Sequence, residues 1–154
     1  IDILRRATAP IIDEYDFVLI DCPPMLGVLM INALAACDKL IIPVQTEFLS
    51  LKGLEHMLHT VSMINHSRRS ALPYFIVPTM HDGRTKAAID CLAELHKRYE
   101  ENVWKGFVPV DIRFREASKL GLPLPEMAPD SPGASAYRQL LTVLSEPEVS
   151  VSNG

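Results

Sequence analysis

The chain has 154 residues and a mass of 17.2 kDa; 48% of its residues are hydrophobic, 22% are charged, and its formal net charge is −4. These values are typical of one ordinary soluble domain with a sizeable core, and the mild acidity excludes a strongly basic protein that coats nucleic acid. No apolar run reaches the roughly 18 residues that span a bilayer, and the N-terminus lacks the layout of a signal peptide, so we expect a cytoplasmic protein.

The N-terminal residues follow the pattern of an amphipathic helix. Its apolar positions are Ile3, Leu4, Ala7, Ile11 and Ile12. The chain opens on Ile1, inside this pattern, and not on methionine. We therefore expect it to be a piece of a longer protein.

After Tyr15, four short apolar runs alternate with longer helical stretches. The predicted strands are 16–21, 39–44, 74–80 and 103–108. Strands that are apolar throughout indicate a sheet covered on both faces. The pattern therefore predicts an α/β fold with a parallel twisted sheet and helices on both faces.

Helices are predicted between these strands because apolar residues recur there at i, i+3 and i+4. The predicted helices are 25–37, one from about Phe48, one that Thr85 caps, and 134–144, with Ser131 or Gly133 near its start. The side chains expected to face the core of the last three are Leu51, Leu54, Leu58, Val61 and Ile64; Ala88, Leu92, Leu95 and Tyr99; and Tyr137, Leu140, Leu141 and Leu144. Residues 147–154 are predicted to form a flexible tail.

Three cysteines, Cys22, Cys37 and Cys91, lie far apart in the sequence. An odd number at wide spacing fits neither a disulfide framework nor a CxxC pair that binds metal or performs redox chemistry. We expect buried free thiols, because unpaired cysteine behaves as a small hydrophobic residue.

Asp21 ends the apolar run 17–20, which places its carboxylate at the carboxyl end of a buried strand. Open α/β sheets bind their ligands at this edge. In P-loop nucleotidases an aspartate at this position holds the hydrated Mg²⁺ that bridges the β- and γ-phosphates. A strand-terminal aspartate is also a common turn residue or helix cap, so this pattern alone leaves both roles open.

Several motifs, in order along the chain, resemble the ParA/Soj/MinD-like deviant Walker ATPases, and most closely the ParA branch. The motifs are YDFVLIDCPP at 15–24, LIIPVQTE at 40–47, PTMHDGRT at 78–85, VPVDIR at 108–113, EA at 116–117 and GA at 133–134. They cover nearly the whole chain. Within the family, 21–37 and 103–117 are most similar to members encoded with polar chemotaxis machinery.

The resemblance implies a P-loop NTPase-like fold and hydrolysis of ATP with Mg²⁺. Asp21 would be the catalytic Walker B aspartate, holding Mg²⁺ through water, and Cys22, Pro23 and Pro24 would belong to the switch II loop. The family carries a glycine-rich phosphate loop upstream of this strand, and none of the seven glycines here forms such a cluster. We therefore expect residues 1–146 to be the C-terminal portion of one ParA-like nucleotide-binding domain that lacks the phosphate-loop strand. This chain would be inactive alone, although the parent protein would be an ATPase.

The resemblance also places the adenine base between two strand ends. The residues implied are Thr79 and Met80 in one segment and Pro109, Val110 and Asp111 in the other. Both segments would end strands at the same sheet edge, where exposed backbone groups can read the edge of the base. Val110 and Asp111 replace an Arg-Asn pair common in the family, and without the resemblance the two segments would be ordinary turns.

Basic side chains concentrate between residues 84 and 119, a segment with eight basic and six acidic side chains. The resemblance implies that residues of this segment bind DNA without sequence preference, by pairing with phosphates and releasing counterions. The residues implied are Arg84, Lys86, Arg113, Arg115 and Lys119. The alternative is a solvated helix face balanced by its own acidic residues, because an excess of two charges is small for a polyanion binder.

Together these features predict an ATP-dependent positioning switch. In the family, ATP drives formation of a homodimer that binds a surface, and hydrolysis releases it. The implied partners are nonspecific DNA and a ParB-like or polar adaptor protein, with chromosome, plasmid or a chemotaxis array as cargo. A MinD-like ATPase on the membrane is one alternative, but 147–154 is too short and polar for the basic amphipathic helix expected there. A non-enzymatic fragment that only binds partners is the other.

Overall fold

The computed structural model describes residues 3–22, 27–66, 68 and 70–145. The chain divides into two compact units. The first comprises Ile1–Ile42 and Lys52–Phe75, and the second comprises Pro43–Leu51 and Ile76–Gly154. These boundaries cut both strands of the sheet, so each unit holds a part of each strand.

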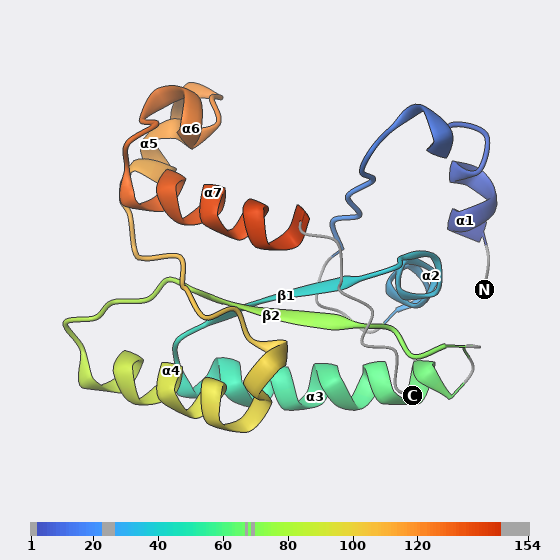
Figure 1. Ribbon diagram of the computed structural model, residues 1–154, viewed down its shortest axis with the longest axis horizontal. Helices are drawn as coiled ribbons and strands as arrows, with labels where there is room; N and C mark the ends of the chain where they lie inside the picture. The colour runs from blue at the N-terminus through green and yellow to red at the C-terminus, as the bar shows by residue number, and fades with distance from the viewer. Residues whose placement is uncertain (1–2, 23–26, 67, 69, 146–154) are drawn as a thin grey trace, which may run out of the picture. The chain divides into compact units, whose positions relative to one another are not determined.

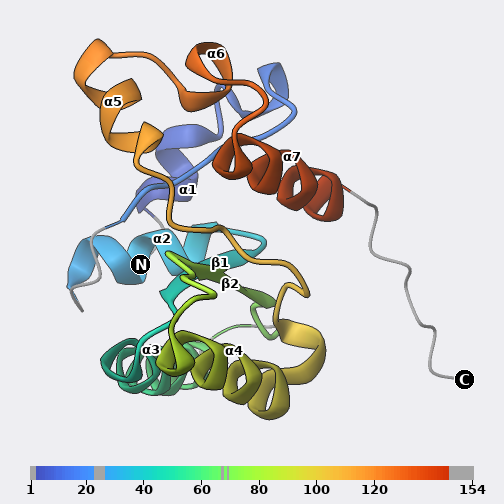
Figure 2. The ribbon, with the colours of Figure 1, turned by 90° about the vertical axis from the view of Figure 1, so that its left-hand side faces the viewer.

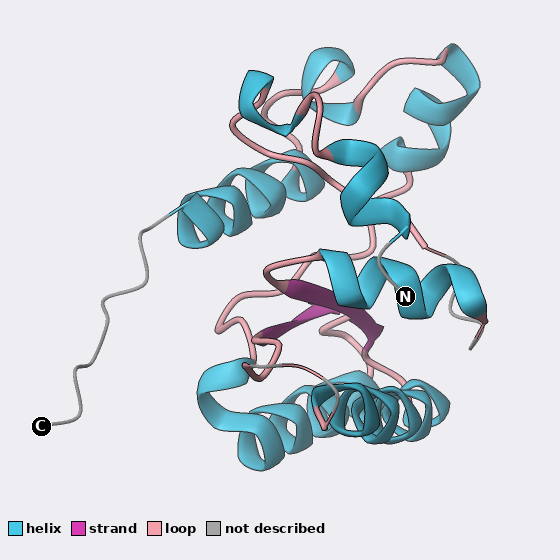
Figure 3. Ribbon diagram, turned by 90° about the vertical axis from the view of Figure 1, so that its right-hand side faces the viewer, coloured by secondary structure: helices cyan, strands magenta, loops and turns pink. Residues whose placement is uncertain are grey.

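The sheet pairs two strands that run in the same direction. They are β1, Leu40–Gln45, and β2, Tyr74–Thr79, the magenta strands of Figure 3. The Leu40 N–H donates to the Pro73 carbonyl at 2.9 Å, and the Thr46 N–H donates to the Thr79 carbonyl at 3.2 Å. Residue numbers rise together in the two pairs, so the strands are parallel. The predictions of strands at 39–44 and 74–80 and of a parallel α/β sheet are confirmed.

The predicted strand 103–108 pairs with β2 only at isolated positions. Parallel bridges join Ile76 to Val103 and His81 to Pro109. The N–H of Trp104 donates to the Ile76 carbonyl at 2.9 Å, within the second unit. This segment therefore lies along β2 as the sequence predicts, without forming a continuous strand.

The prediction of a strand at 16–21 is wrong. These residues have no regular structure and are all exposed, Leu19 with 88% of its surface accessible. A strand exists only where a neighbouring backbone accepts and donates its hydrogen bonds, and no described strand pairs with this segment. Its apolar sequence therefore remains in solvent, on the path between η1 (Ile12–Glu14) and α2 (Val28–Ala36) in Figure 1.

The helices confirm most of the predicted ranges. The remaining described helices are α1, Ile3–Thr8; α3, Phe48–Asn65; α4, Lys86–Tyr99; η2, Glu100–Asn102; α5, Arg113–Leu120; α6, Leu124–Met127; and α7, Pro132–Ser145. The helix predicted at 25–37 appears as α2, and its first residues lie outside the described part of the chain. The predicted N-terminal helix is shorter than expected: α1 ends at Thr8, and Ile11 and Ile12, predicted on its apolar face, are exposed. Helices α5 and α6 were not predicted; both are short.

The first unit has a small core beneath α2. Met30, Leu34 and Leu72 form its buried cluster. Arg68 closes the C-terminal end of α2, because its guanidinium donates to the carbonyls of Leu34 at 2.6 Å and Cys37 at 3.3 Å. A cation at this position satisfies the last carbonyls of the helix and its negative dipole end.

The second unit packs α4 and α7 on opposite sides of its strands (Figures 1 and 2). The buried residues of the two helices are Ala88, Cys91 and Leu95 in α4 and Gly133, Ala134, Ala136 and Leu140 in α7. The predicted inward face of α4 is confirmed. In α7 the prediction is wrong for Leu141, which is exposed, and for Tyr137, which is half exposed and packs edge-on against Phe114. The buried face of α7 begins with the small residues Gly133, Ala134 and Ala136, so it is shifted by about one position from the face that the sequence predicts.

The three cysteines are free thiols, as predicted. Cys91 is buried, and burial raises the pKa of its thiol. Cys22 and Cys37 are only half-buried. The predicted tail, 147–154, lies outside the described residues.

Thr85 caps α4 as the sequence predicts, since its hydroxyl accepts the Ala88 N–H at 3.3 Å. Thr85→Ala is expected to lower the free energy of unfolding by about 1 kcal/mol. Urea unfolding followed by circular dichroism measures this. The matched control is Thr142→Ala, because the Thr142 hydroxyl only donates to the Arg138 carbonyl within α7. It should be neutral or slightly stabilising, since alanine is the better helix former. An equal loss in both variants would contradict the assigned cap.

Candidate functional site

The residues after β2 lie beside the turn that follows 103–108, at the carboxyl end of the parallel strands. His81 joins the two: its N–H donates to the Val108 carbonyl at 3.1 Å, and its carbonyl accepts the Val110 N–H at 3.1 Å. Thr79 and Met80 are thereby placed next to Pro109, Val110 and Asp111, as the sequence predicts. This edge is where open parallel sheets bind ligands.

Met80 has a left-handed backbone, with φ at 52°. A non-glycine residue in this region costs about 1–2 kcal/mol relative to the right-handed conformation. Its side chain is exposed, as is that of Val110 across the edge. The strained backbone therefore lies where the chain leaves β2. The Met80 side chain is in solvent there, beside the turn 109–111.

His81 is buried between the strand ends and has a larger structural role than its sequence context indicated. Its Nδ1 lies 3.3 Å from the hydroxyl oxygen of the buried Thr46, just after β1. Its ring packs against Phe107, with ring centroids 4.3 Å apart. One side chain thus connects the ends of β1, β2 and the 103–109 segment. The signal was a polar residue close after each of the two strands, Thr46 directly after β1 and His81 two residues after β2.

The Asp111 side chain holds the turn and is not open to a ligand, since only 3% of it is accessible. Its Oδ1 accepts the backbone N–H of Arg113 at 3.1 Å and the Arg113 Nε–H at 2.8 Å. Its Oδ2 accepts the Gly133 N–H at 3.1 Å, in the first turn of α7. The Arg113 guanidinium is the main cause of a lowered pKa for Asp111. A contact of Asp111 with a base, which stays a prediction, would therefore have to involve its backbone.

Gly133 allows this close approach of α7 to α5. A Cβ atom at Gly133 would lie 2.6 Å from Cε2 of Phe114, closer than atoms can pack. The Ser131 hydroxyl caps the same helix by accepting the Ala134 N–H at 3.1 Å. The start of α7 is thus fixed to the sheet edge by Asp111 and by its own cap.

The basic residues singled out by the sequence lie on the second unit. Arg84 is 87% exposed and Arg113 is 40% exposed. Lys86, Arg115 and Lys119 are exposed as well, on α4 and α5. Arg84 pairs with Asp82 at 2.7 Å, and this pairing lowers the pKa of Asp82 to about 2.

The residues predicted to serve Mg²⁺ and the switch belong to the first unit. Asp21 is exposed and Cys22 is half-buried. Pro23 and Pro24 lie outside the described residues. Within the described chain, no group of three or more His, Cys, Asp or Glu side chains could hold a metal ion by itself.

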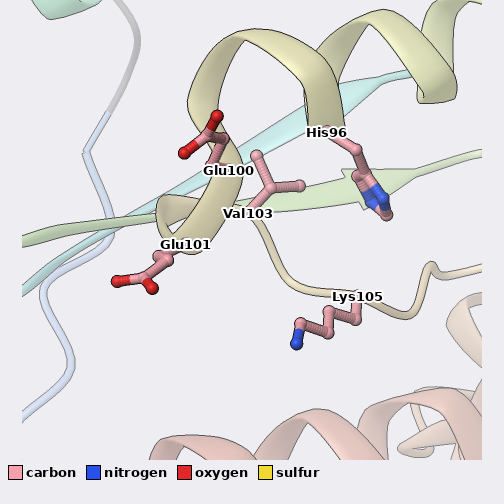
Figure 4. Close-up of a pocket in the computed structure, with 5 residues that line it drawn as sticks. All are labelled: His96, Glu100, Glu101, Val103 and Lys105. Carbon is pink, nitrogen blue, oxygen red and sulfur yellow. The ribbon is translucent and has the colours of Figure 1, made fainter.

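A separate pocket of about 470 Å³ lies at the C-terminal end of α4 (Figure 4). It is lined by His96, Glu100, Glu101, Val103 and Lys105. The His96 Nε2 is buried and has no hydrogen-bond partner among the described residues. None of the predicted site residues that the structure describes lines this pocket. Val103 lies at the start of the 103–109 segment, whereas the strand-end residues lie at its finish.

Comparison with known proteins agrees with this architecture. A family model described as "AAA domain" matches residues 2–74. The sporulation initiation inhibitor protein Soj of Bacillus subtilis is 38% identical over 138 residues, which are 89% of this chain and 54% of Soj. The chromosome-partitioning ATPase Soj of Treponema pallidum is 36% identical over the same shares of the two chains.

Solved structures show the same fold. A cobyrinic acid a,c-diamide synthase from Mycobacterium smegmatis, with bound ATP analog and magnesium, is 33% identical, with a TM-score of 0.74 over 93% of this chain and 52% of that one. The McdA(D38A)–ATP complex of Cyanothece is 18% identical, with a TM-score of 0.80 over 96% of this chain and 58% of that one.

The parallel strands with helices on both sides define an α/β fold of the P-loop NTPase type. The chain belongs to the ParA/Soj-like family within the MinD/ParA group. It spans about half the length of the curated relatives it matches. None of the described helices is long and apolar enough to cross a bilayer.

Asp111→Asn tests the role of the Asp111 carboxylate. The amide cannot accept from both Arg113 and Gly133, so the variant should lose about 1.5–3 kcal/mol of unfolding free energy at pH 7. The folded state lowers the pKa of Asp111, so the ionised carboxylate stabilises the fold. This contribution to the free energy of unfolding is complete above the ordinary aspartate pKa of about 3.9, and it is lost as the pH falls through the folded-state pKa. The gap between wild type and variant should therefore shrink below about pH 4.

Urea unfolding at several pH values measures this gap. The matched control is Asp90→Asn on the exposed face of α4, which should change stability by at most about 0.5 kcal/mol. A pH-independent gap for Asp111→Asn would contradict the assigned ion pair.

Proposed function

We propose that this chain forms part of an ATP-dependent partitioning or positioning ATPase. The observation that carries the proposal is the His81–Pro109 bridge, which sets Thr79 and Met80 beside the turn 109–111 at the carboxyl edge of the parallel strands. The ATP analog and magnesium in the M. smegmatis synthase and the ATPase names of the Soj relatives support it.

In this proposal the base of ATP lies at the strand-end site of the second unit. Thr79 and Met80 on one side and Pro109 and Val110 on the other would hold it mainly through backbone groups. Asp111 would contribute through its position in the turn, because its carboxylate is occupied by Arg113 and Gly133. Such a site selects a flat, hydrogen-bonding ring and does not depend on the charge of any side chain.

Asp21 would hold Mg²⁺ through water, and Cys22, Pro23 and Pro24 would follow it as the switch II loop. A carboxylate is the oxygen ligand that Mg²⁺ prefers, and Asp21 is exposed and available. Bound ATP with Mg²⁺ would supply the phosphoryl group whose hydrolysis resets the switch. No glycine-rich phosphate loop occurs among the 154 residues.

The surface that binds in the ATP state would be the basic edge of the second unit. Its residues are Arg84, Lys86, Arg113, Arg115 and Lys119. Exposed lysine and arginine side chains bind DNA phosphates without reading the bases. An ATP-driven homodimer would double this edge, and a ParB-like or polar adaptor would trigger its release. The cargo would be a chromosome, a plasmid or a polar array such as a chemotaxis cluster.

Asp21→Ala tests the metal role. In the protein at the length its gene encodes, this change should reduce ATP hydrolysis at least about a hundredfold, because the ordered metal shell is lost. Phosphate release measures the rate, and a circular dichroism melt checks the fold. The matched control is Asp16→Ala, which changes an aspartate in the same exposed segment and should keep its rate. Equal rates in wild type and Asp21→Ala would overturn the assignment.

Arg113→Glu tests the DNA surface in the same protein with ATP and Mg²⁺. Reversal should weaken binding to any duplex sequence and flatten its salt dependence, by about one in the log–log slope for each phosphate that the variant no longer neutralises. Fluorescence anisotropy across a salt series measures both. Lys97→Glu, an equal charge reversal on exposed α4, serves as control. If wild type retards no DNA even at low salt, the surface bound is not DNA.

A further inference from the structure

Two aspartate–arginine segments in the second unit adopt the same hydrogen-bonded geometry. In each, an aspartate Oδ1 accepts the backbone N–H of the arginine two residues later at 3.1 Å and the Nε–H of that arginine at 2.8 Å. The segments are Asp82–Gly83–Arg84 and Asp111–Ile112–Arg113. Each aspartate thus builds a local turn and fixes the orientation of its own guanidinium group.

The two segments lie at the same edge of the sheet. The parallel bridge between His81 and Pro109 precedes Asp82 by one residue and Asp111 by two. The Val110 N–H, hydrogen-bonded to the His81 carbonyl, continues this pairing up to the second segment. Both guanidinium groups are therefore presented from adjacent positions on the edge that holds the proposed DNA surface.

The segments differ in how the aspartate uses its second oxygen. Asp82 Oδ2 accepts the Arg84 Nη2–H at 2.7 Å, so both carboxylate oxygens bind one guanidinium. Asp111 Oδ2 instead accepts the Gly133 N–H at 3.1 Å. Arg113 therefore keeps both Nη groups without a hydrogen bond to the described residues, whereas Arg84 is neutralised in a two-point ion pair.

The settings of the two aspartates also differ. The side chain of Asp82 is 27% exposed and supports a loop, whereas the side chain of Asp111 is almost fully buried and anchors a helix. Removing the charge of Asp82 leaves an asparagine, which still accepts the Arg84 backbone N–H and keeps the turn. An asparagine at this position would thus remove the charge beside Arg84 without removing the acceptor of the turn.

We propose that Asp82 is a counter-charge that restrains the affinity of Arg84 for phosphate groups of nucleic acid, while Asp111 orients Arg113 and leaves its Nη groups for them. The inference rests on the proposed DNA-binding function and adds its regulation. A phosphate that approaches Arg84 competes with Asp82 for the same donor edge and meets a like charge there. The edge would thus bind DNA weakly enough to be released.

A double-mutant cycle tests this with the protein at its gene-encoded length, ATP, Mg²⁺ and a fluorescein-labelled duplex of mixed sequence. Asp82→Asn should bind about threefold to tenfold more tightly and steepen the log–log salt slope by up to about 0.9, as expected when one more phosphate is neutralised. Arg84→Ala should cost about twofold in wild type and at least about fivefold in the Asp82→Asn background, because Arg84 then contacts phosphate. Asp82→Ser, which also keeps a turn-forming oxygen, should match Asp82→Asn.

Glu101→Gln is the matched control, since it removes one exposed negative charge from the same unit, beyond the C-terminal end of α4. Helix α4 has 14 residues and is therefore about 21 Å long, so Glu101 lies far from Arg84 and Lys86 at the other end, and its loss should change affinity less than about twofold. The inference is overturned if Asp82→Asn binds no more tightly than Glu101→Gln, or if Arg84→Ala costs the same in both backgrounds. Failure of wild type to bind DNA at any salt concentration would instead overturn the proposed DNA-binding function, and the inference with it.

Discussion

The backbone of His81 pairs with the segment that lies beside β2. Its N–H donates to the Val108 carbonyl, and its carbonyl accepts the Val110 N–H. The arrangement of the residues around the strand ends in the second unit depends on this pairing. Because parallel pairing fixes register, it decides which residues after β2 face which residues of the next turn. Met80 leaves the strand with positive φ directly before this pair, and Asp111 comes two residues after its bridge partner, Pro109. From there the Asp111 carboxylate reaches Gly133 and fixes α7. The residues proposed to hold the base, the basic side chains Arg84 and Arg113 and the start of α7 thus depend on one backbone pairing.

The features that the sequence predicted well are those set by a few neighbouring residues. Thr85 caps α4 and Ser131 caps α7 because each hydroxyl needs only an N–H three residues ahead. The strands β1 and β2 and the long helix α3 follow from apolar runs whose length and period are local properties. The resemblance added the order of the motifs, which the relatives confirm at the level of the family.

The features that the sequence did not predict depend on partners far along the chain. Residues 16–21 have the composition of a strand, but composition supplies no hydrogen-bond neighbour, and the segment remains exposed. The inward face of α7 was misplaced at Leu141 because Gly133 lets Phe114 approach the helix start, a contact between positions nineteen residues apart. The burial of the Asp111 carboxylate was likewise not predicted, because it depends on α7, whose Gly133 N–H lies 22 positions further along the chain.

The two Asp-x-Arg segments show the same limit in the chemistry of a site. Their sequences are equivalent at the two positions that matter, and their local turns have equal hydrogen-bond lengths. What separates them is a single donor from elsewhere in the fold, the Gly133 N–H, which binds one oxygen of Asp111 and has no counterpart at Asp82 among the described residues. The Asp111 carboxylate binds both Arg113 and the Gly133 N–H of α7. The Asp82 carboxylate binds Arg84 with both of its oxygens. In the proposed surface, two equal motifs thus leave the Nη groups of Arg113 for phosphate and pair those of Arg84 with a counter-charge, and only the tertiary surroundings distinguish them.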